Sequence, residues 1–217
     1  MKTLSLLGLA GLMAVTASAG LISYNTNGSS LTCGLSTPNC VQNNQTSLTV
    51  GTGGNTITLV YNASGANNIN APSLINLGFL DATAIGSPGL TSLAGVILNI
   101  NVNNTQPANG SGQIQSGTIS GSIGISQSGA IIQFAPSNTT TGFGTLPGVV
   151  IVVGGFSATY QVLQTTLGLV PPTSGGPQGV GETSIQGAVT DSPEPTTLVL
   201  MGAGLGLVGL LRRRAVR

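Results

Sequence analysis

The chain has 217 residues, only 4% of them charged, and it contains no histidine and no tryptophan. The absence of histidine excludes Ser-His-Asp and Cys-His catalysis. The basic side chains all lie near the two ends of the sequence, so nucleic acid and anionic lipid are poor partners for the long segment between them. These basic residues are Lys2, Arg212, Arg213, Arg214 and Arg217.

The N-terminus has the organisation of a secretory signal peptide, which we assign to residues 1–19. Lys2 gives it a positive start, a short apolar run follows, and Ala17 and Ala19 provide a small-residue cleavage site. We therefore expect the mature chain to begin directly after Ala19. An uncleaved anchor is the less favoured alternative, because the apolar run is short.

Between the two ends, residues 20–192 contain no lysine, arginine or histidine. Their only charged side chains are Asp81, Glu182 and Asp191, so the net charge of this segment is minus three before its termini are counted. Asn, Thr, Ser, Gln and Gly provide the polar surface, while recurrent Val, Ile and Leu runs predict a buried core. About 170 residues are enough for one domain of this kind.

Cys33 and Cys40 are the only cysteines, and export would place them in an oxidising compartment. We expect them to form a disulfide that closes the loop at residues 34–39, in which Pro38 and Asn39 favour a turn. A loop of this size contributes about 2 kcal/mol on the chain-entropy model. A zinc site is disfavoured, because the chain offers no further cysteine and no histidine as ligands.

Alternation of apolar and polar residues predicts strands along most of the body, as in residues 55–64. The clearest case is residues 96–103, where one face is aliphatic and the other carries Asn99, Asn101 and Asn103. We expect this asparagine face to be solvent-exposed, and it is the first place to look for contacts with a partner.

Other stretches predict further strands. Residues 149–153 are apolar on both faces, which is typical of a central strand, and Gly154 and Gly155 are expected to break it or to form a bulge. Residues 111–129 alternate more loosely, so we expect an exposed or edge strand there, with a solenoid turn as the less favoured alternative. Weaker strand candidates occur at residues 48–50, 77–80 and 184–189.

About eight short strands separated by Gly, Asn and Pro turns favour an all-β fold, an antiparallel β-sandwich, with a jelly roll as one version of it. We assign the sandwich to residues 20–167. A Gly/Pro-rich connector is assigned to residues 168–191, within which a last strand has room to return to the sheet.

The C-terminus, residues 192–217, combines three features in a fixed order. Pro193, Glu194 and Pro195 keep the chain extended, because proline bars a helix. A glycine-rich apolar helix follows at residues 198–211, and together with the two threonines that can cap it this segment of about 16 residues spans about 24 Å, a little shorter than a hydrocarbon core of about 30 Å. The positive-inside rule then places the terminal arginines in the cytoplasm and the body outside. This cluster consists of Arg212, Arg213 and Arg214.

These three features closely resemble the PEP-CTERM sorting signal of Gram-negative bacteria. The resemblance implies a single transmembrane sorting helix, an inner-membrane intermediate with a cytoplasmic C-terminus, and processing by exosortase, a membrane-embedded cysteine transpeptidase, at or near Pro193-Glu194-Pro195. It also implies delivery to the cell surface or to an exopolysaccharide matrix. Many members have an apolar residue before the motif, whereas this chain has Ser192. The alternative is an ordinary tail anchor that is never cut.

Two other functions compete with a purely structural role. Asp81 and Glu182 are the only carboxylates well inside the body, and two carboxylates can hydrolyse a glycosidic bond if the fold brings them close. This makes a glycoside hydrolase a remote alternative. A carbohydrate-binding module is the nearer one, although the chain lacks Trp, and Tyr61 and Tyr160 are expected in strands as core or rim residues.

We therefore expect an exported, non-enzymatic surface or matrix protein that needs no metal or cofactor. Its expected partners are exosortase, transiently the inner membrane, and exopolysaccharide. A nearly uncharged surface also favours self-association.

Overall fold

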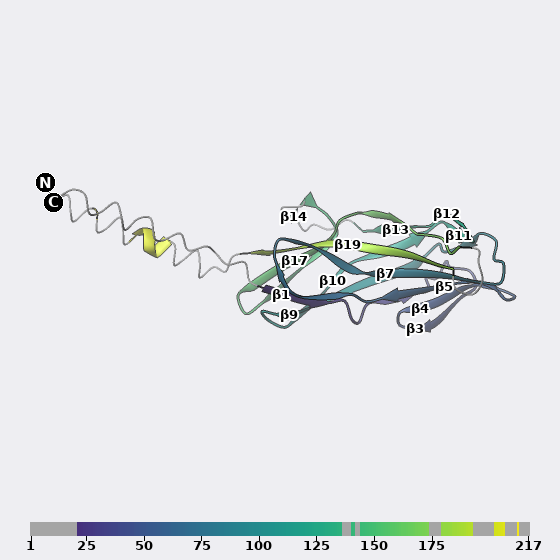
Figure 1. The fold of residues 1–217 in the computed structure, drawn as a ribbon, viewed down its shortest axis with the longest axis horizontal. Helices are drawn as coiled ribbons and strands as arrows, with labels where there is room; N and C mark the ends of the chain where they lie inside the picture. The colour runs from purple at the N-terminus through teal and green to yellow at the C-terminus, as the bar shows by residue number, and fades with distance from the viewer. Residues whose placement is uncertain are drawn as a thin grey trace.

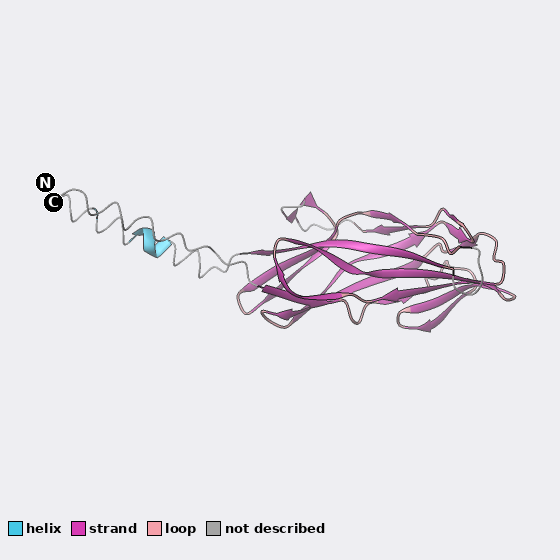
Figure 2. Cartoon of the chain, in the orientation of Figure 1, coloured by secondary structure: helices cyan, strands magenta, loops and turns pink. Residues whose placement is uncertain are grey.

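The computed structural model describes residues 21–135, 140–141, 144–173, 179–192, 202–206 and 212. Up to Ser192 these residues form an elongated body built from strands (Figure 1, Figure 2). All strand pairs in this part of the chain are antiparallel. The expectation of an all-β, antiparallel, sandwich-like fold is confirmed.

Two seven-stranded sheets make up the sandwich. The first sheet has the order β18 (Thr166–Gly168), β13 (Ile131–Phe134), β10 (Gly110–Ser120), β9 (Val96–Gln106), β1 (Leu21–Asn25) and β6 (Gly65–Asn70), and β2 (Ser30–Thr32) also pairs with β9. The second sheet has the order β16 (Gly148–Val153), β17 (Phe156–Val162), β19 (Val180–Ser192), β7 (Ser73–Ile85), β5 (Asn55–Asn62), β4 (Ser47–Thr52) and β3 (Cys40–Asn44).

Two smaller pairings complete the strands. A three-stranded sheet has the order β12 (Gln127–Ser128), β11 (Ser122–Gly124) and β8 (Thr91–Ser92). A separate hairpin consists of β14 (Thr140–Thr141) and β15 (Gly144–Thr145).

The hydrophobic core follows the alternation seen in the sequence. On β9 the aliphatic face is buried and the asparagine face is half-buried. On β5, Ile57, Leu59 and Tyr61 are buried while the residues between them are partly exposed. These inward faces belong to one continuous cluster that draws on both sheets, so the local period of two decides which side of each strand faces the core.

The longest strands, β7 and β19, lie side by side in the middle of the second sheet. Residues 180–192, which the sequence placed in the connector region with room for a last strand, therefore form a central strand of the sandwich. It pairs with β17 on one side and with β7 on the other (Figure 1).

Two local expectations were wrong and one was confirmed. Residues 149–153 form part of β16, which is an edge strand and not the expected central strand, because only β17 pairs with it. Gly154 and Gly155 break the stretch as expected, by forming the two-residue turn of the β16–β17 hairpin, for which both adopt positive φ angles of 61° and 89°. Residues 110–120 form β10, an interior strand between β9 and β13, and not an edge strand or a solenoid turn.

Within the described ranges no helix is long and apolar enough to cross a membrane. Of the helix expected at residues 198–211, only residues 202–206 are described, and they are helical. Arg212 is also helical and exposed. Apart from Ser192, which ends β19, the remaining residues of the two targeting signals lie outside the described residues; those singled out above are Lys2, Ala17, Ala19, Pro193, Glu194, Pro195, Arg213, Arg214 and Arg217.

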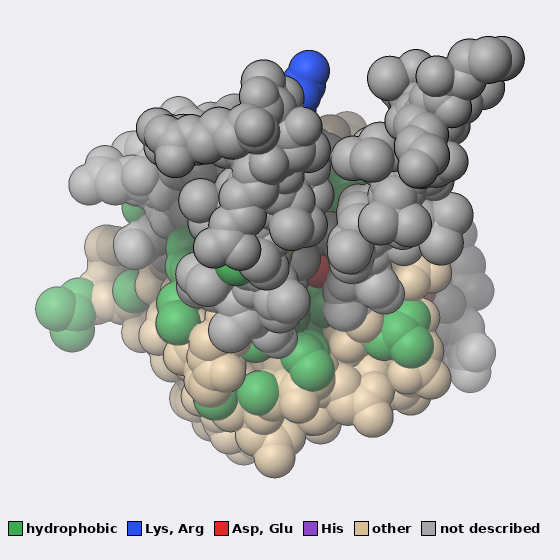
Figure 3. Space-filling model, turned by 90° about the vertical axis from the view of Figure 1, so that its left-hand side faces the viewer, with side chains coloured by type: hydrophobic (Ala, Val, Ile, Leu, Met, Phe, Trp, Pro, Cys, Tyr) green, Lys and Arg blue, Asp and Glu red, His purple; other side chains and the backbone are tan. Residues whose placement is uncertain are grey.

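β1, the first strand, begins at the same end of the body at which β19, the last strand, ends (Figure 1). Leu21 pairs with Asn70, directly before β7, and Ser73 at the start of β7 pairs with Val189 near the end of β19. In the view from that end, the described side chains in sight are mostly hydrophobic or uncharged polar ones, with one blue and one red group visible (Figure 3). We call this end the tether end and the opposite one the far end.

Candidate functional site

The predicted disulfide is present and joins the two sheets. Cys33 directly follows β2 of the first sheet, Cys40 begins β3 of the second sheet, and their Cα atoms are 5.8 Å apart. The Gln42 side chain reinforces the crossing, because its Nε2 donates to the Leu31 carbonyl oxygen at 2.6 Å and its Oε1 accepts from the Cys33 N–H at 3.2 Å. The bond therefore fixes a chain crossing between the layers.

Asp81 and Glu182, far apart in the sequence, are brought together by the fold. They are direct cross-strand partners on β7 and β19, so their side chains share the outer face of the second sheet. Glu182 is exposed and Asp81 is half-buried. Asp81 Oδ2 accepts a hydrogen bond from Asn62 Nδ2 at 2.6 Å, while its buried Oδ1 has no hydrogen-bond partner.

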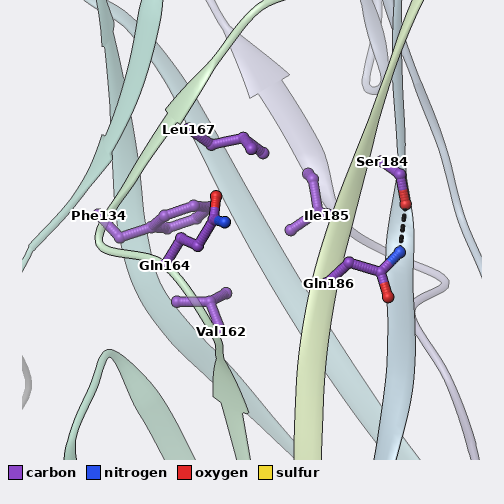
Figure 4. A pocket seen from close by; sticks show the side chains of 7 residues that line it. All are labelled: Phe134, Val162, Gln164, Leu167, Ser184, Ile185 and Gln186. Carbon is purple, nitrogen blue, oxygen red and sulfur yellow. Dashed lines mark hydrogen bonds between the residues drawn. The ribbon is translucent and has the colours of Figure 1, made fainter.

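A cavity near β19 is lined by other residues than this carboxylate pair (Figure 4). That cavity has a volume of about 100 Å³, well below the roughly 300–1,000 Å³ of typical small-molecule sites. Neither acid lines it, and its two polar β19 side chains, Ser184 and Gln186, are hydrogen-bonded to each other. The residues that line it are Phe134, Val162, Gln164, Leu167, Ser184, Ile185 and Gln186.

The asparagine face of β9 is half-buried, and its amides form hydrogen bonds within the protein. It is therefore not the freely exposed contact surface that was expected. Asn101 Nδ2 donates to the Gly28 carbonyl oxygen at 2.6 Å, and Asn103 Nδ2 donates to the Asn27 carbonyl oxygen at 2.7 Å. Asn99 Oδ1 accepts from the neighbouring strand β10; its donors are Gln113 Nε2 and Ser116 Oγ. These amides hold the loop after β1 and the strand β10 against β9.

A polar connection between the sheets was not foreseen from the sequence. The Tyr160 hydroxyl on β17 donates to Asn104 Oδ1 on β9 at 2.6 Å, and the Tyr24 hydroxyl on β1 donates to the Asn76 carbonyl oxygen on β7 at 2.7 Å. The two rings lie 5.8 Å apart. The signal for it was the buried-face position of Asn104, which continues the aliphatic face of β9.

Burial changes the acidity of these phenols. Desolvation raises the pKa of Tyr24 to about 12, against the smaller opposing effect of its hydrogen bond to Asn76. Desolvation also raises the pKa of Tyr61 and of Tyr160. Tyr61 and Tyr160 are therefore core residues, one of the two positions expected for them, and neither offers a ring to a sugar.

Comparison with known proteins gives no relative. No protein-family model, no curated protein and no solved structure matches the chain. Among the described residues, no group of three or more His, Cys, Asp or Glu side chains is placed to hold a metal ion.

Proposed function

We propose that this chain is an exported, non-enzymatic protein of the cell surface or the exopolysaccharide matrix, sorted by exosortase. The observation that carries the proposal is the ordered C-terminal sequence: Pro193-Glu194-Pro195, the apolar helix, and the arginine cluster. Each feature alone is weak, but the three in this order match a signal with one purpose.

Properties of the body support export. The Cys33–Cys40 disulfide suits an oxidising compartment. Both chain ends leave the sandwich at the tether end (Figure 1), so an anchor after Ser192 would hold the body by that end and direct the far end outward. The far end carries the disulfide loop, whose Leu35 is fully exposed.

Polysaccharide is the partner that best suits a surface with so few charges. Thr49, Thr58 and Thr83 form one row of directly paired residues across β4, β5 and β7 on the outer face of the second sheet. The Thr49 and Thr58 hydroxyls are 3.0 Å apart, and such hydroxyls can donate to and accept from neutral sugars. This row favours carbohydrate binding as a second candidate function, and a saturable ligand on a glycan array probed with the full chain would support it.

The sorting proposal is tested by the intact mass of the full-length chain expressed in a bacterium that has an exosortase. We expect surface-recovered protein that begins at Gly20, ends near Pro193 and lacks two hydrogens because of the disulfide. Intact mass is required because residues 20–192 contain no site for trypsin.

The variant Glu194→Ala should retain the C-terminal helix and stay in the membrane fraction, because the processing motif is altered. The matched control, Glu182→Ala, removes a carboxylate from the sandwich surface and should be processed like the wild type. A wild-type mass that retains residues 198–217 would make the chain a plain tail-anchored protein and would remove the matrix proposal.

A further inference from the structure

Five strands of the two large sheets pair on one side only, and four of them are protected. β18 and β2 have only three residues each. β6 and β3 are rich in asparagine or glutamine, and each has a register irregularity against its neighbour. Short length, polar side chains and irregular register all oppose pairing with a further strand.

β16 has none of these protections. Its six residues, Gly-Val-Val-Ile-Val-Val, contain no charge and no proline, and its pairing with β17 is regular throughout. No strand among the described residues pairs with its other side. A regular, uncharged, β-branched edge of this kind is a template for another strand.

The direction of the free backbone groups follows from one hydrogen bond. The Val162 N–H donates to the Pro147 carbonyl oxygen at 2.9 Å, and hydrogen-bonded pairs alternate with non-hydrogen-bonded pairs in an antiparallel ladder. Val149, Ile151 and Val153 therefore direct their backbone groups toward β17. Gly148, Val150 and Val152 direct theirs outward from the edge.

The side chains along this edge suit an apolar contact. Val150 is 45% exposed and Val152 is 68% exposed on the outer face. Their cross-strand neighbours on β17 are Thr159 and Ser157, which carry no charge. Two copies of this edge can approach without repulsion between like charges on that face.

We infer that β16 is a self-association interface, at which two copies of the chain pair antiparallel through their β16 edges. A second copy is the occupant that fits, because a two-fold axis at Val150 places each outward-directed residue of one copy opposite an outward-directed residue of the other. Val150 then faces Val150 of the second copy, and Gly148 faces Val152. The pairing joins the second sheet of one copy to the second sheet of the other, which makes one continuous sheet.

This geometry restricts where pairing can occur. Val153 lies beside the turn of the β16–β17 hairpin, and the first residues after that turn pair with the end of β19, so it points to the tether end. Antiparallel copies therefore have their tether ends at opposite ends of the dimer. Two copies held in the same membrane cannot pair in this way, whereas released copies, or copies on facing surfaces, can. The interface itself does not depend on the proposed sorting.

Engineered disulfides test the register in the full-length chain in mild detergent. Directly paired Cα atoms about 5.5 Å apart lie within the range of about 4.4–6.8 Å that a disulfide needs, so Val150→Cys should form a covalent dimer on mild oxidation. In the matched variant Val152→Cys the two introduced thiols lie four residues apart along the strands, about 13 Å. It should stay monomeric on a non-reducing gel, although Val152 is the more exposed residue.

A second measurement uses sedimentation of the cysteine-unaltered chain. We expect the wild type at the mass of a dimer and Val150→Lys at the mass of a monomer, because two lysines would face each other at the axis. Leu74→Lys, a control at another exposed position (67%), should remain dimeric. A monomeric wild type, a dimeric Val150→Lys, or equal cross-linking of Val150→Cys and Val152→Cys would each overturn the inference, and none of these outcomes bears on exosortase sorting.

Discussion

At the scale of single residues, two tyrosines and one asparagine provide polar contacts that join the two sheets. Tyr160 and Asn104 connect β17 to β9, and Tyr24 connects β1 to the backbone of β7. A buried hydroxyl or amide is stable only when it is hydrogen-bonded. These contacts therefore fix the position of one sheet relative to the other, in addition to the non-directional packing of aliphatic side chains.

The tyrosines predict a pH effect that absorbance can measure. The pKa of Tyr24 is raised to about 12 and those of Tyr61 and Tyr160 are also raised, all mainly by burial. These are the only tyrosines of the chain, which has no tryptophan. The tyrosinate absorbance of the folded protein should therefore appear only well above pH 10, whereas the urea-unfolded chain should titrate near about 10.

The raised pKa values of the tyrosines also predict how the stability of the fold changes with pH. Above pH 10 the unfolded chain releases protons that the folded chain retains, so the free energy of unfolding should fall as the pH rises from about 10 toward 12 and should not change from this cause below about 10. Tyr24→Phe should make that fall shallower. Native titration near pH 10 would contradict the burial of these phenols.

The position of Asp81 predicts an effect of its charge on the free energy of unfolding. It faces Glu182 across the strands with no cationic side chain anywhere in residues 20–192 to compensate, and directly opposed like charges destabilise a sheet. Asp81→Asn keeps an acceptor for Asn62 and should raise the free energy of unfolding at pH 7 by about 0.2–1 kcal/mol, measured by urea denaturation at low salt.

The control for Asp81 is Asp191→Asn, whose partner on β17 is the uncharged Ala158 and which should have a smaller effect. A loss of stability in Asp81→Asn would show that the carboxylate has a favourable role. A loss of turnover on a polysaccharide substrate would revive the glycoside hydrolase alternative, whereas an unchanged turnover would remove it.

At the scale of elements, the chain crosses between the sheets directly after β2 and enters β3. The crossing is closed by the disulfide and by the Gln42 side chain. The Thr37 hydroxyl adds a hydrogen bond to the Ala94 carbonyl oxygen at 2.8 Å, which ties the loop to the segment before β9. One short loop thus holds three elements together at the far end.

Removing the disulfide should destabilise the fold without changing its topology. The double variant Cys33→Ser with Cys40→Ser should lose about 2 kcal/mol of unfolding free energy, because the unfolded chain gains the freedom of an open loop. Leu35→Ser is the matched control, since Leu35 is fully exposed at the same loop and should leave the stability nearly unchanged. A loss in the double variant no larger than in the control would mean that Gln42 and Thr37 alone hold the crossing.

At the scale of the whole molecule, the sandwich is a weakly charged body with a tether end and a far end. Its solubility rests on amides and hydroxyls, and several of the amides are used internally along β9. Two described surfaces suit partners: the outer face of the second sheet, with its threonine row, and the β16 edge. The first would suit a sugar polymer and the second a further copy of the chain, and a matrix protein would have use for both.

Much of the fold could be predicted because its strands carry a local pattern. The buried faces of β5 and β9 and the Cys33–Cys40 bond were expected, since alternation and a seven-residue spacing are properties of short stretches of sequence. Strand order could not be predicted. The apolar stretch in β16 had the composition of a central strand, yet it lies at an edge, where Val150 and Val152 remain exposed.

The candidate sites likewise divide into those that a short stretch of sequence predicts and those that depend on the fold. The sorting signal is linear, so Pro193-Glu194-Pro195 and the residues after it could be identified without a fold, and their processing stays a prediction. By itself the sequence determined the low charge of the body, the face that each strong strand turns inward and the disulfide, because side-chain period and spacing act over a few residues. Only the tertiary structure decided that Asp81 meets Glu182, that the asparagines of β9 bind the neighbouring loop and strand, and that β16 has a free edge. Those facts depend on which strands become neighbours, and neighbours are chosen by packing between segments distant in the chain, which alternation within one strand does not encode.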